Sequence, residues 1–358
     1  MLILAVLVVA GCTAAPTEGE PTPSQTATPE PTEPALTAPR SALPLTCDEL
    51  YGLAELQPQL AEPVQVRKDE SSAPLGVRAA QAMQSGALEC VFGGDSRTDS
   101  SYDYGLSILV FPAAGAAFDS YRASEAGAGL LGYARLDTLG DRSMLTCQGS
   151  EMFGSAESPG DTFICGGDFV VGDYWVTARL SDRSDLLTDA AYELATAVMQ
   201  TVAARIAEAG SPRALWIPPT GADPAALCSD PAAATALLGV DASTLAVEIT
   251  PEYRAAGVPL LSCQWTTEST GLRLTALQSG AWAFDRVEAT PGMTFHGWLR
   301  PSERFDIEGT DGALVTCIDA CYGFISWEGS LIQISFDEPT FDPVIAAERL
   351  QAWGAALP

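Results

Sequence analysis

Cys12 is the residue whose surroundings predict the most definite chemistry. Residues 2–10 are wholly apolar and lead into Val9-Ala10-Gly11-Cys12, the pattern that lipoprotein signal peptidase reads. Small residues let the chain enter that peptidase extended, and the thiol then receives diacylglycerol. An apolar run this short is roughly half of what a membrane-spanning helix needs. We therefore expect a signal peptide over residues 1–12, cleavage before Cys12 and acylation of Cys12 with palmitate. The alternative is an unmodified, buried thiol.

Residues 13–45 change abruptly in composition to Pro, Thr, Glu and Ala. Closely spaced prolines fix φ and remove hydrogen-bond donors, so this stretch is not expected to pack as a helix or a sheet. In an extended polyproline conformation it would reach roughly 100 Å, at about 3 Å per residue. The composition predicts a disordered spacer, either bare or carrying sugars on its threonines.

The cysteines that follow Cys12 are eight in number, and an even number is typical of a disulfide framework in an exported protein. No C-x-x-C pair among them indicates a redox catalyst or a zinc site. They fall into two groups of four, and bridges confined to one group allow three pairings in each. The groups are Cys47, Cys90, Cys147 and Cys165, then Cys228, Cys263, Cys317 and Cys321.

The two halves of the chain resemble each other. Residues 165–180 match residues 321–336 without a gap, and both segments are typical of hairpins, with turns at Gly172-Asp173 and Glu328-Gly329. Upstream, Gly105-Leu106-Ser107-Ile108 corresponds to Gly271-Leu272-Arg273-Leu274. A duplicated module explains these matches better than chance similarity in an alanine-rich chain.

Each module is expected to contain the same order of elements. A short helix follows the first cysteine, with Asp48 or Asp230 favouring its N-terminus, and strands carry the other cysteines. Middle helices are expected at 116–126 and 281–289, and closing helices at 189–209 and 343–356. This order predicts an α+β fold of two tandem modules, each an antiparallel sheet with helices packed on one face. It favours the disulfides Cys47–Cys90, Cys147–Cys165, Cys228–Cys263 and Cys317–Cys321.

Composition places the module boundaries. Four prolines fall within residues 211–226, which we expect to be a linker. The first module is then expected at 46–210 and the second at 227–358.

The charge balance excludes some partners. The chain has 46 acidic and 18 basic residues and a net charge of −28. A surface this negative repels nucleic acid phosphates and anionic lipid headgroups, so no nucleic-acid partner is expected. Lys68 is the only lysine, and with the abundant alanine this favours a high-GC, actinobacterial source.

The lipobox at Cys12, the Thr/Pro spacer and the repeated Cys-helix-strand-Cys-x-Trp arrangement, as in Cys228 to Cys263-Gln264-Trp265, carry a resemblance. The chain resembles uncharacterised actinobacterial cell-envelope lipoproteins. It is also similar to the extracytoplasmic sensor domains of mycobacterial Ser/Thr kinases, in which helices cover a disulfide-pinned antiparallel sheet. The first module departs from the pattern, because Phe92 stands where the tryptophan would be. The resemblance implies binding or sensing in the envelope and supplies no catalytic residues.

Other chemistry-bearing residues favour structural roles. His296 is the only histidine, which leaves a Ser-His-Asp triad or a multi-histidine metal centre one candidate at most. Asp95, Asp99 and Asp103 could be weighed as calcium ligands, but their spacing of four and the intervening Arg97 favour a polar loop. The tryptophans could stack on sugars, although burial in a small core is the better expectation. They are Trp265, Trp282, Trp298 and Trp327.

Together these features predict a lipid-anchored protein on the extracytoplasmic face of the cell membrane that binds or senses a ligand or partner of the envelope. No catalytic residue, cofactor or metal site is predicted. The alternatives are a carboxylate-based hydrolase of cell-wall polymers, which needs only two acidic side chains, and a structural envelope protein.

Overall fold

The computed structural model describes most of the chain beyond the spacer. The described residues are 38–61, 63–71, 76–93, 105–112, 118, 139–149, 162–183, 188–224, 227–228, 231–239, 247–252, 260–266, 271–289, 303–317, 321–336 and 343–356. Cys12 and most of the predicted spacer lie outside them. The fold begins before residue 46, where the spacer was expected to end, because Ala42 and Leu43 are already buried in the core.

The first half of the chain forms a six-stranded antiparallel sheet with the order β1-β2-β3-β6-β5-β4. Its strands are β1 (Gln65–Lys68), β2 (Leu88–Gly93), β3 (Gly105–Phe111), β4 (Arg142–Gly149), β5 (Thr162–Val171) and β6 (Tyr174–Arg183). Its helices are α1 (Cys47–Tyr51), α2 (Leu53–Leu56), the short 3-10 helix η1 (Gln57–Gln59), α3 (Val77–Gln84) and α5 (Thr188–Ala209).

The second half forms a seven-stranded antiparallel sheet with the order β10-β11-β12-β13-β9-β8-β7. Its strands are β7 (Val247–Glu252), β8 (Leu260–Thr266), β9 (Gly271–Leu277), β10 (Glu303–Phe305), β11 (Gly312–Cys317), β12 (Cys321–Trp327) and β13 (Ser330–Phe336). Its helices are α7 (Pro231–Leu238), the 3-10 helix η4 (Ala281–Ala283), α8 (Phe284–Ala289) and α9 (Pro343–Gly354).

The two sheets repeat one arrangement. Strands β7, β8, β9, β11, β12 and β13 occupy the places of β1 to β6 in the same order, and β10 is an additional edge strand. The register repeats too, since Cys90 lies opposite Ile108 and Cys263 lies opposite Leu274. The prediction of an α+β fold with two antiparallel modules is therefore confirmed.

The hairpin turns at the corresponding positions differ in type. Between β12 and β13, Glu328 and Gly329 both have positive φ, of 45° and 80°, which is the type I′ pattern. Between β5 and β6, Gly172 has φ of 55° and Asp173 does not have a positive value, which is the type II′ pattern. Both turns suit the right-handed twist of the strands that they join.

The four disulfides join the pairs that the order of elements favours: Cys47–Cys90, Cys147–Cys165, Cys228–Cys263 and Cys317–Cys321. Cys47–Cys90 ties the opening helix α1 to β2, and Cys228–Cys263 ties the chain before α7 to β8. The other two bridges join directly opposite residues of neighbouring strands. In each module one bridge therefore fastens a helical segment and the other fastens a strand pair.

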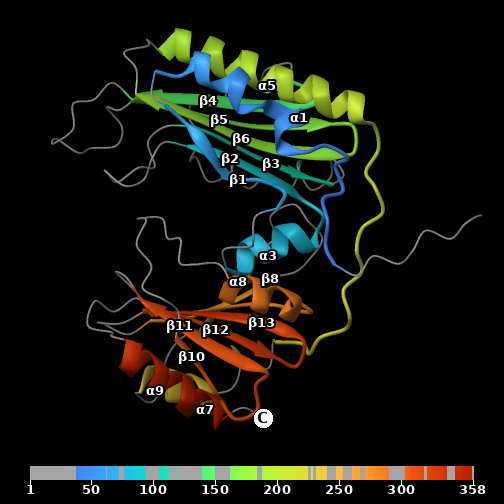
Figure 1. Cartoon of the computed structure of the whole chain (residues 1–358). Helices are drawn as coiled ribbons and strands as arrows, with labels where there is room; N and C mark the ends of the chain where they lie inside the picture. Colours follow the sequence, from blue (N-terminus) through green and yellow to red (C-terminus); the bar gives the residue numbers. More distant parts are fainter. Residues whose placement is uncertain are drawn as a thin grey trace, which may run out of the picture. The chain divides into compact units, whose positions relative to one another are not determined.

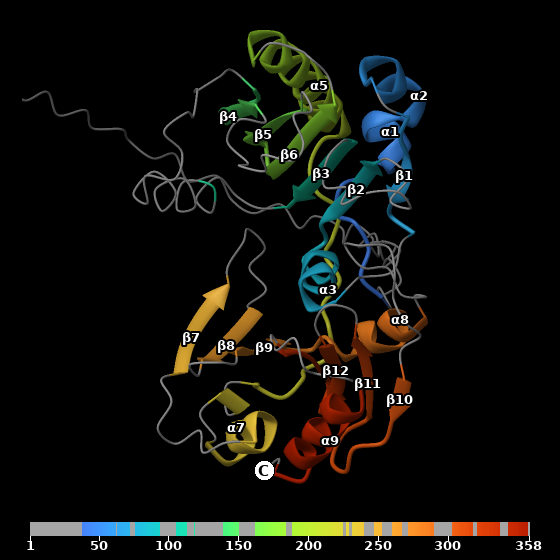
Figure 2. The same cartoon turned by 90° about the vertical axis from the view of Figure 1, so that its left-hand side faces the viewer.

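A helix at the end of each module covers one face of its sheet. α5 lies across β4, β5 and β6, and α9 and α7 lie side by side against the second sheet (Figures 1 and 2). The second sheet is also packed on its opposite face, where α8 supplies Phe284 and Val287.

The closing helices approach their sheets at a glycine in the middle of a strand. A Cβ atom on Gly167 of β5 would lie 2.4 Å from Met199 Sδ of α5. At the matching position of β12, a Cβ atom on Gly323 would lie 2.5 Å from Leu350 Cδ1 of α9. Real Cβ atoms do not approach other atoms this closely, so a larger residue at either position would require the end of the facing Met199 or Leu350 side chain to shift.

The opening helix starts at the first cysteine, as expected, and is capped by the residue before it. The N-cap of α1 is Thr46, which forms a capping box with Glu49. Asp48 lies in the first turn, where its charge favours the helix N-terminus without capping it. The sequence at this point, Thr-Cys-Asp-Glu, carries the S/T-x-x-E signature that identifies such a cap.

α3 was not foreseen, and it packs against both sheets, which belong to one compact unit, 36–358. Val77 and Ala80 join the apolar cluster over the second sheet, and Ala82 joins the cluster on the first sheet with Phe111 and Trp175. Hydrogen bonds fix the position of the helix: Gln84 donates to the Gln278 carbonyl (3.1 Å) and accepts from Trp282 Nε1 (2.9 Å). α3 is therefore a link between the two modules.

α9 ends at Gly354, two residues before the expected end. The middle element of the second module has the expected bounds, 281–289, and consists of η4 followed by α8. Of the middle helix expected at 116–126, only Phe118 is among the described residues.

We expect Gly167→Ala to lower the free energy of unfolding by about 1 kcal/mol, because the added methyl group displaces the flexible end of the Met199 side chain. Gly166→Ala is the matched control, since its Cβ would meet no atom within 4 Å. The control should be neutral or stabilising by up to about 1 kcal/mol. Urea unfolding followed by circular dichroism measures both, and equal stabilities for the two variants would contradict the close helix–sheet contact.

Candidate functional site

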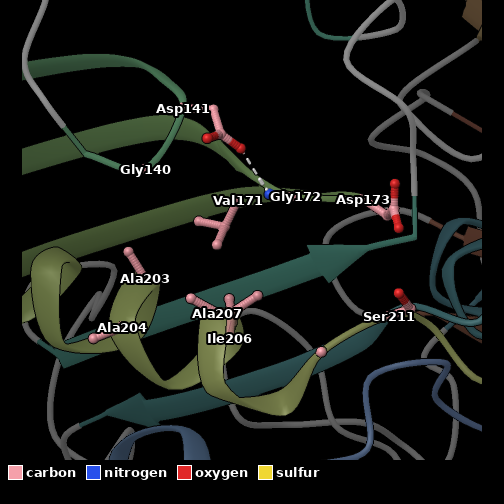
Figure 3. A pocket seen from close by; sticks show the side chains of 11 residues that line it. Gly140, Asp141, Val171, Gly172, Asp173, Ala203, Ala204, Ile206, Ala207 and Ser211 are labelled. Carbon is pink, nitrogen blue, oxygen red and sulfur yellow. Dashed lines mark hydrogen bonds between the residues drawn. The ribbon is translucent and has the colours of Figure 1, made fainter.

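A hollow of about 520 Å³ lies where the end of α5 meets the β5–β6 turn and the loop before β4 (Figure 3). This volume is within the usual range for small-molecule sites. The lining residues are Gly140, Asp141, Val171, Gly172, Asp173, Ala203, Ala204, Ile206, Ala207, Gly210 and Ser211.

Small side chains on α5 leave the space open. Ile206 is buried against the sheet, whereas Ala204 and Ala207, in the same turn of the helix, are exposed. The helix ends at Gly210, whose φ of 78° is the left-handed conformation that terminates helices, and Pro212 follows. Three alanines near the helix end and a glycine after it therefore form one wall without filling the hollow.

The opposite wall is held rigidly by its backbone. The Asp141 amide donates to the Val170 carbonyl (2.7 Å), and the Asp141 carboxylate accepts from the Gly172 amide (2.8 Å). A Cβ atom on Gly140 would lie 2.2 Å from the Val170 oxygen, so the loop can approach the strand only with glycine there. The loop before β4 and the β5–β6 turn are thereby locked together.

The lining favours a positively charged ligand. Asp141 and Asp173 are exposed and bring two carboxylates to the hollow, and Ser211 adds a hydroxyl group. No Lys, Arg or His is among the described residues that line it. The C-terminal end of the 22-residue helix α5 adds the negative end of its dipole. An ammonium or guanidinium group fits this lining better than an anion.

The corresponding place in the second module is closed by contact. The Asp311 amide donates to the Ser326 carbonyl (2.8 Å), which repeats the bond between Asp141 and Val170. There the helix end packs directly on the loop, because a Cβ atom on Gly354 would lie 1.8 Å from Ile307 Cγ2. Ile307 is buried in the second core. The hollow is thus a local difference at a place where the strand and helix arrangement of the two modules matches.

Tyr174 lies next to Asp173 and turns into the core. It is 1% exposed, and its hydroxyl has no hydrogen-bond partner among the residues that the structure describes. Burial raises the pKa of Tyr174 above its ordinary value, and the Asp173 charge raises it further, while Arg213 acts in the opposite direction. The phenol is therefore held in its neutral form.

We expect Tyr174→Phe to keep wild-type stability at pH 7, because no hydrogen bond of the described residues is lost. A raised pKa in the folded state means that the neutral phenol contributes stability below about pH 10, and this contribution falls as pH rises further. The variant should therefore lose less stability than wild type when thermal unfolding is compared at pH 8 and pH 10.5.

Tyr51→Phe is the matched control, because Tyr51 Oη accepts a hydrogen bond from Gln59 (2.6 Å). Its loss should cost about 1 kcal/mol at pH 7. Equal costs at pH 7 for the two variants would show that Tyr174 has a partner after all.

Aromatic residues gather at the second module. Trp265 and Trp327 are buried in its core, as expected, whereas Trp282 is half-buried and lies edge-on to Trp216 at 5.7 Å between ring centroids. The Arg286 guanidinium lies over the Trp282 ring at 5.5 Å from its centroid. Two of the three described candidates therefore serve the core, and Trp282 serves the junction with α3.

The remaining candidates lie outside the described residues: Asp95, Asp99, Asp103, His296, Trp298 and Cys12. Within the described part of the chain, no group of three or more His, Cys, Asp or Glu side chains could hold a metal ion. No helix of that part is long and apolar enough to span a membrane.

Sequence reasoning identified the Gly172-Asp173 turn but not the hollow beside it. The hollow requires Asp141, Asp173 and Ala207, which are far apart in sequence and come together only through strand pairing and the docking of α5. A signal was present in the run of alanines near the end of α5, since large apolar residues would be expected there if the helix were packed all along its length.

No protein-family model matches the chain, and no curated protein matches it. Among solved structures, the chain is similar to the di-domain ARO/CYC StfQ from the steffimycin biosynthetic pathway, at 12% identity. The match covers 86% of this chain and 92% of that chain, with a TM-score of 0.15. A TM-score this low carries no argument about fold or function.

Proposed function

We propose that the protein is a lipoprotein, anchored through Cys12 on the extracytoplasmic face of the cell membrane, that binds a ligand or partner of the cell envelope. The observation that carries this proposal is the use of its cysteines. Eight of them are paired in disulfides, and the ninth stands directly after an apolar leader and Ala10-Gly11. Disulfides persist in oxidising compartments, and a lipobox supplies the route to one.

The anchor is strong enough for permanent attachment. A single acyl chain binds membranes only marginally, whereas two or three chains on one residue give stable anchoring. The Pro/Thr-rich residues that follow Cys12 would then connect the folded part to the lipid and set how far from it the fold can reach.

The hollow beside α5 is the ligand site that we propose, and its ligand is a small molecule or peptide end that carries an amine or a guanidinium. Its volume, its two carboxylates and the helix end all support this class of ligand. The closed counterpart in the second module supports it further, because the hollow is then not a consequence of the module architecture alone.

The same carboxylates give little support to the hydrolase alternative. A glycosidase needs two acids that face each other across the bond that it cleaves. The Asp141 carboxylate points to the Gly172 amide, and the side chain of Asp173, the next residue of the turn, does not point back at it (Figure 3). This arrangement suits the binding of a cation better than acid–base catalysis.

The anchor is tested by expression in an actinobacterial host. Wild-type protein should be found in the membrane fraction with an acylated Cys12 as its first residue, and Cys12→Ala should be released from the membrane. Thr13→Ala is the control, since it lies beside the lipobox and leaves the thiol in place. Intact mass and thiol labelling measure the result, and an unacylated chain with reduced cysteines would refute the proposal.

The ligand site is tested by calorimetric titration with 1,5-diaminopentane. Asp173→Asn should weaken binding by about 1 kcal/mol or less, roughly fivefold, because the lost charge pair is exposed to solvent. Ala207→Leu should weaken it by filling the hollow without a change of charge.

Asp306→Asn is the charge control, since it removes one exposed acid outside the hollow. Equal affinities for all four proteins would mean that the amine is held by overall charge alone. If the folded part of the protein captures no envelope lipid, glycan or protein, the binding function is excluded and a structural role in the envelope remains.

A further inference from the structure

Three segments that are distant in sequence meet beside α3. The Ala42 amide donates to the Gly86 carbonyl (2.7 Å), and the Arg213 amide donates to the Ala42 carbonyl (2.8 Å). Ala42 belongs to the first described stretch of the chain, Gly86 follows α3, and Arg213 lies near the start of the linker between the modules. The linker therefore runs alongside the point where the N-terminal spacer joins the fold.

The linker displays two apolar side chains at this point. The Leu215 side chain is 47% exposed and the Ile217 side chain is 87% exposed. Between them, Trp216 is 7% exposed and packs edge-on against Trp282. Because Trp282 is in turn hydrogen-bonded to Gln84, the linker is fastened at its centre and presents Leu215 and Ile217 outward.

Basic residues accompany this apolar pair. Arg213 and Arg40 are exposed, and Arg40 lies two residues before Ala42. The chain has only 18 basic residues against 46 acidic ones, so two exposed arginines near one apolar pair differ from its general surface. Acids lie near Arg213 as well: the Thr46 cap holds the pKa of Glu49 below its usual value, with a smaller contribution from Arg213, and Asp173 and Arg213 both act on the pKa of Tyr174.

We propose that this surface, formed by Leu215, Ile217, Arg40 and Arg213, rests on the lipid membrane to which the chain is tethered. The inference rests on the proposed anchor at Cys12. Exposed aliphatic side chains flanked by arginine are the combination that binds at the membrane–water interface. The segment that follows the spacer joins the fold beside this surface, so the tether keeps the surface within reach of the lipid.

The net charge reinforces one orientation. A net charge of −28 repels anionic headgroups, so most of the protein surface is disfavoured at such a membrane. The surface around Arg40 and Arg213 lies next to the spacer. There the positive charges of the two arginines attract anionic headgroups, and Leu215 and Ile217 add exposed apolar area.

The test uses acylated full-length protein on vesicles of phosphatidylcholine, with and without phosphatidylglycerol. Hydrogen exchange of residues 211–220 is measured, with Cys12→Ala protein free in solution as the reference. Wild type should exchange severalfold more slowly at the linker on vesicles, and Ile217→Glu should lose most of this protection. Val344→Glu is the matched control, because Val344 is 65% exposed on α9 and should retain it.

The outcomes separate the two proposals. Acylated protein that is bound to vesicles but unprotected at the linker overturns the lipid-facing surface and leaves the anchor intact. A chain that carries no lipid overturns the anchor and this surface together. Linker protection that appears without vesicles and rises with protein concentration assigns the surface to a second copy of the chain, and this also overturns the proposal.

Discussion

The contact between each closing helix and a strand glycine is the constraint on which both modules depend. A helix packs at 8–10 Å from its neighbour when side chains interdigitate, and a glycine in the strand lets it settle at one defined position. Gly167 meets Met199 in this way, and Gly323 meets Leu350. Once the helix is seated, its remaining apolar side chains cover the alternating inward residues of the sheet, from Phe163 to Val171 in the first module. The recurrence of this contact at matching positions supports one ancestral packing arrangement for both halves.

The parts of the fold that the sequence predicted are those that depend on local pattern. Alternating apolar residues around Gly172-Asp173 and Glu328-Gly329 predicted the hairpins, and the order of the cysteines predicted the four bridges. α3 could not be predicted in the same way. Its buried residues Val77 and Ala80 pack against the sheet of the other module. A pattern within one module does not reveal that contact. The hollow was missed for a related reason, because a space between elements has no periodicity of its own.

Two features set the first module apart, in addition to the edge strand β10 that extends the second sheet. The second module closes its helix end with Ile307, whereas the first leaves a hollow between Asp141 and Ala207. The segment between the first two strands of the first module contains α3, and the matching segment of the second module, residues 253–259, has only seven residues. A duplicated unit can retain packing in one copy while the other copy changes, since each sheet keeps its own core. The first module therefore carries both the proposed ligand site and the helix α3, which contacts the second module.

That connection also bears on how a ligand at the hollow could act. Ser211, which lines the hollow, begins the linker, and Trp216 five residues later packs on Trp282 beside α3. Trp282 is hydrogen-bonded to Gln84 at the end of α3. A ligand that orders the end of α5 would therefore restrain a chain segment whose other end is fixed at the junction of the modules. The physical path is short and covalent, so coupling between the hollow and the junction would require no rearrangement of either sheet.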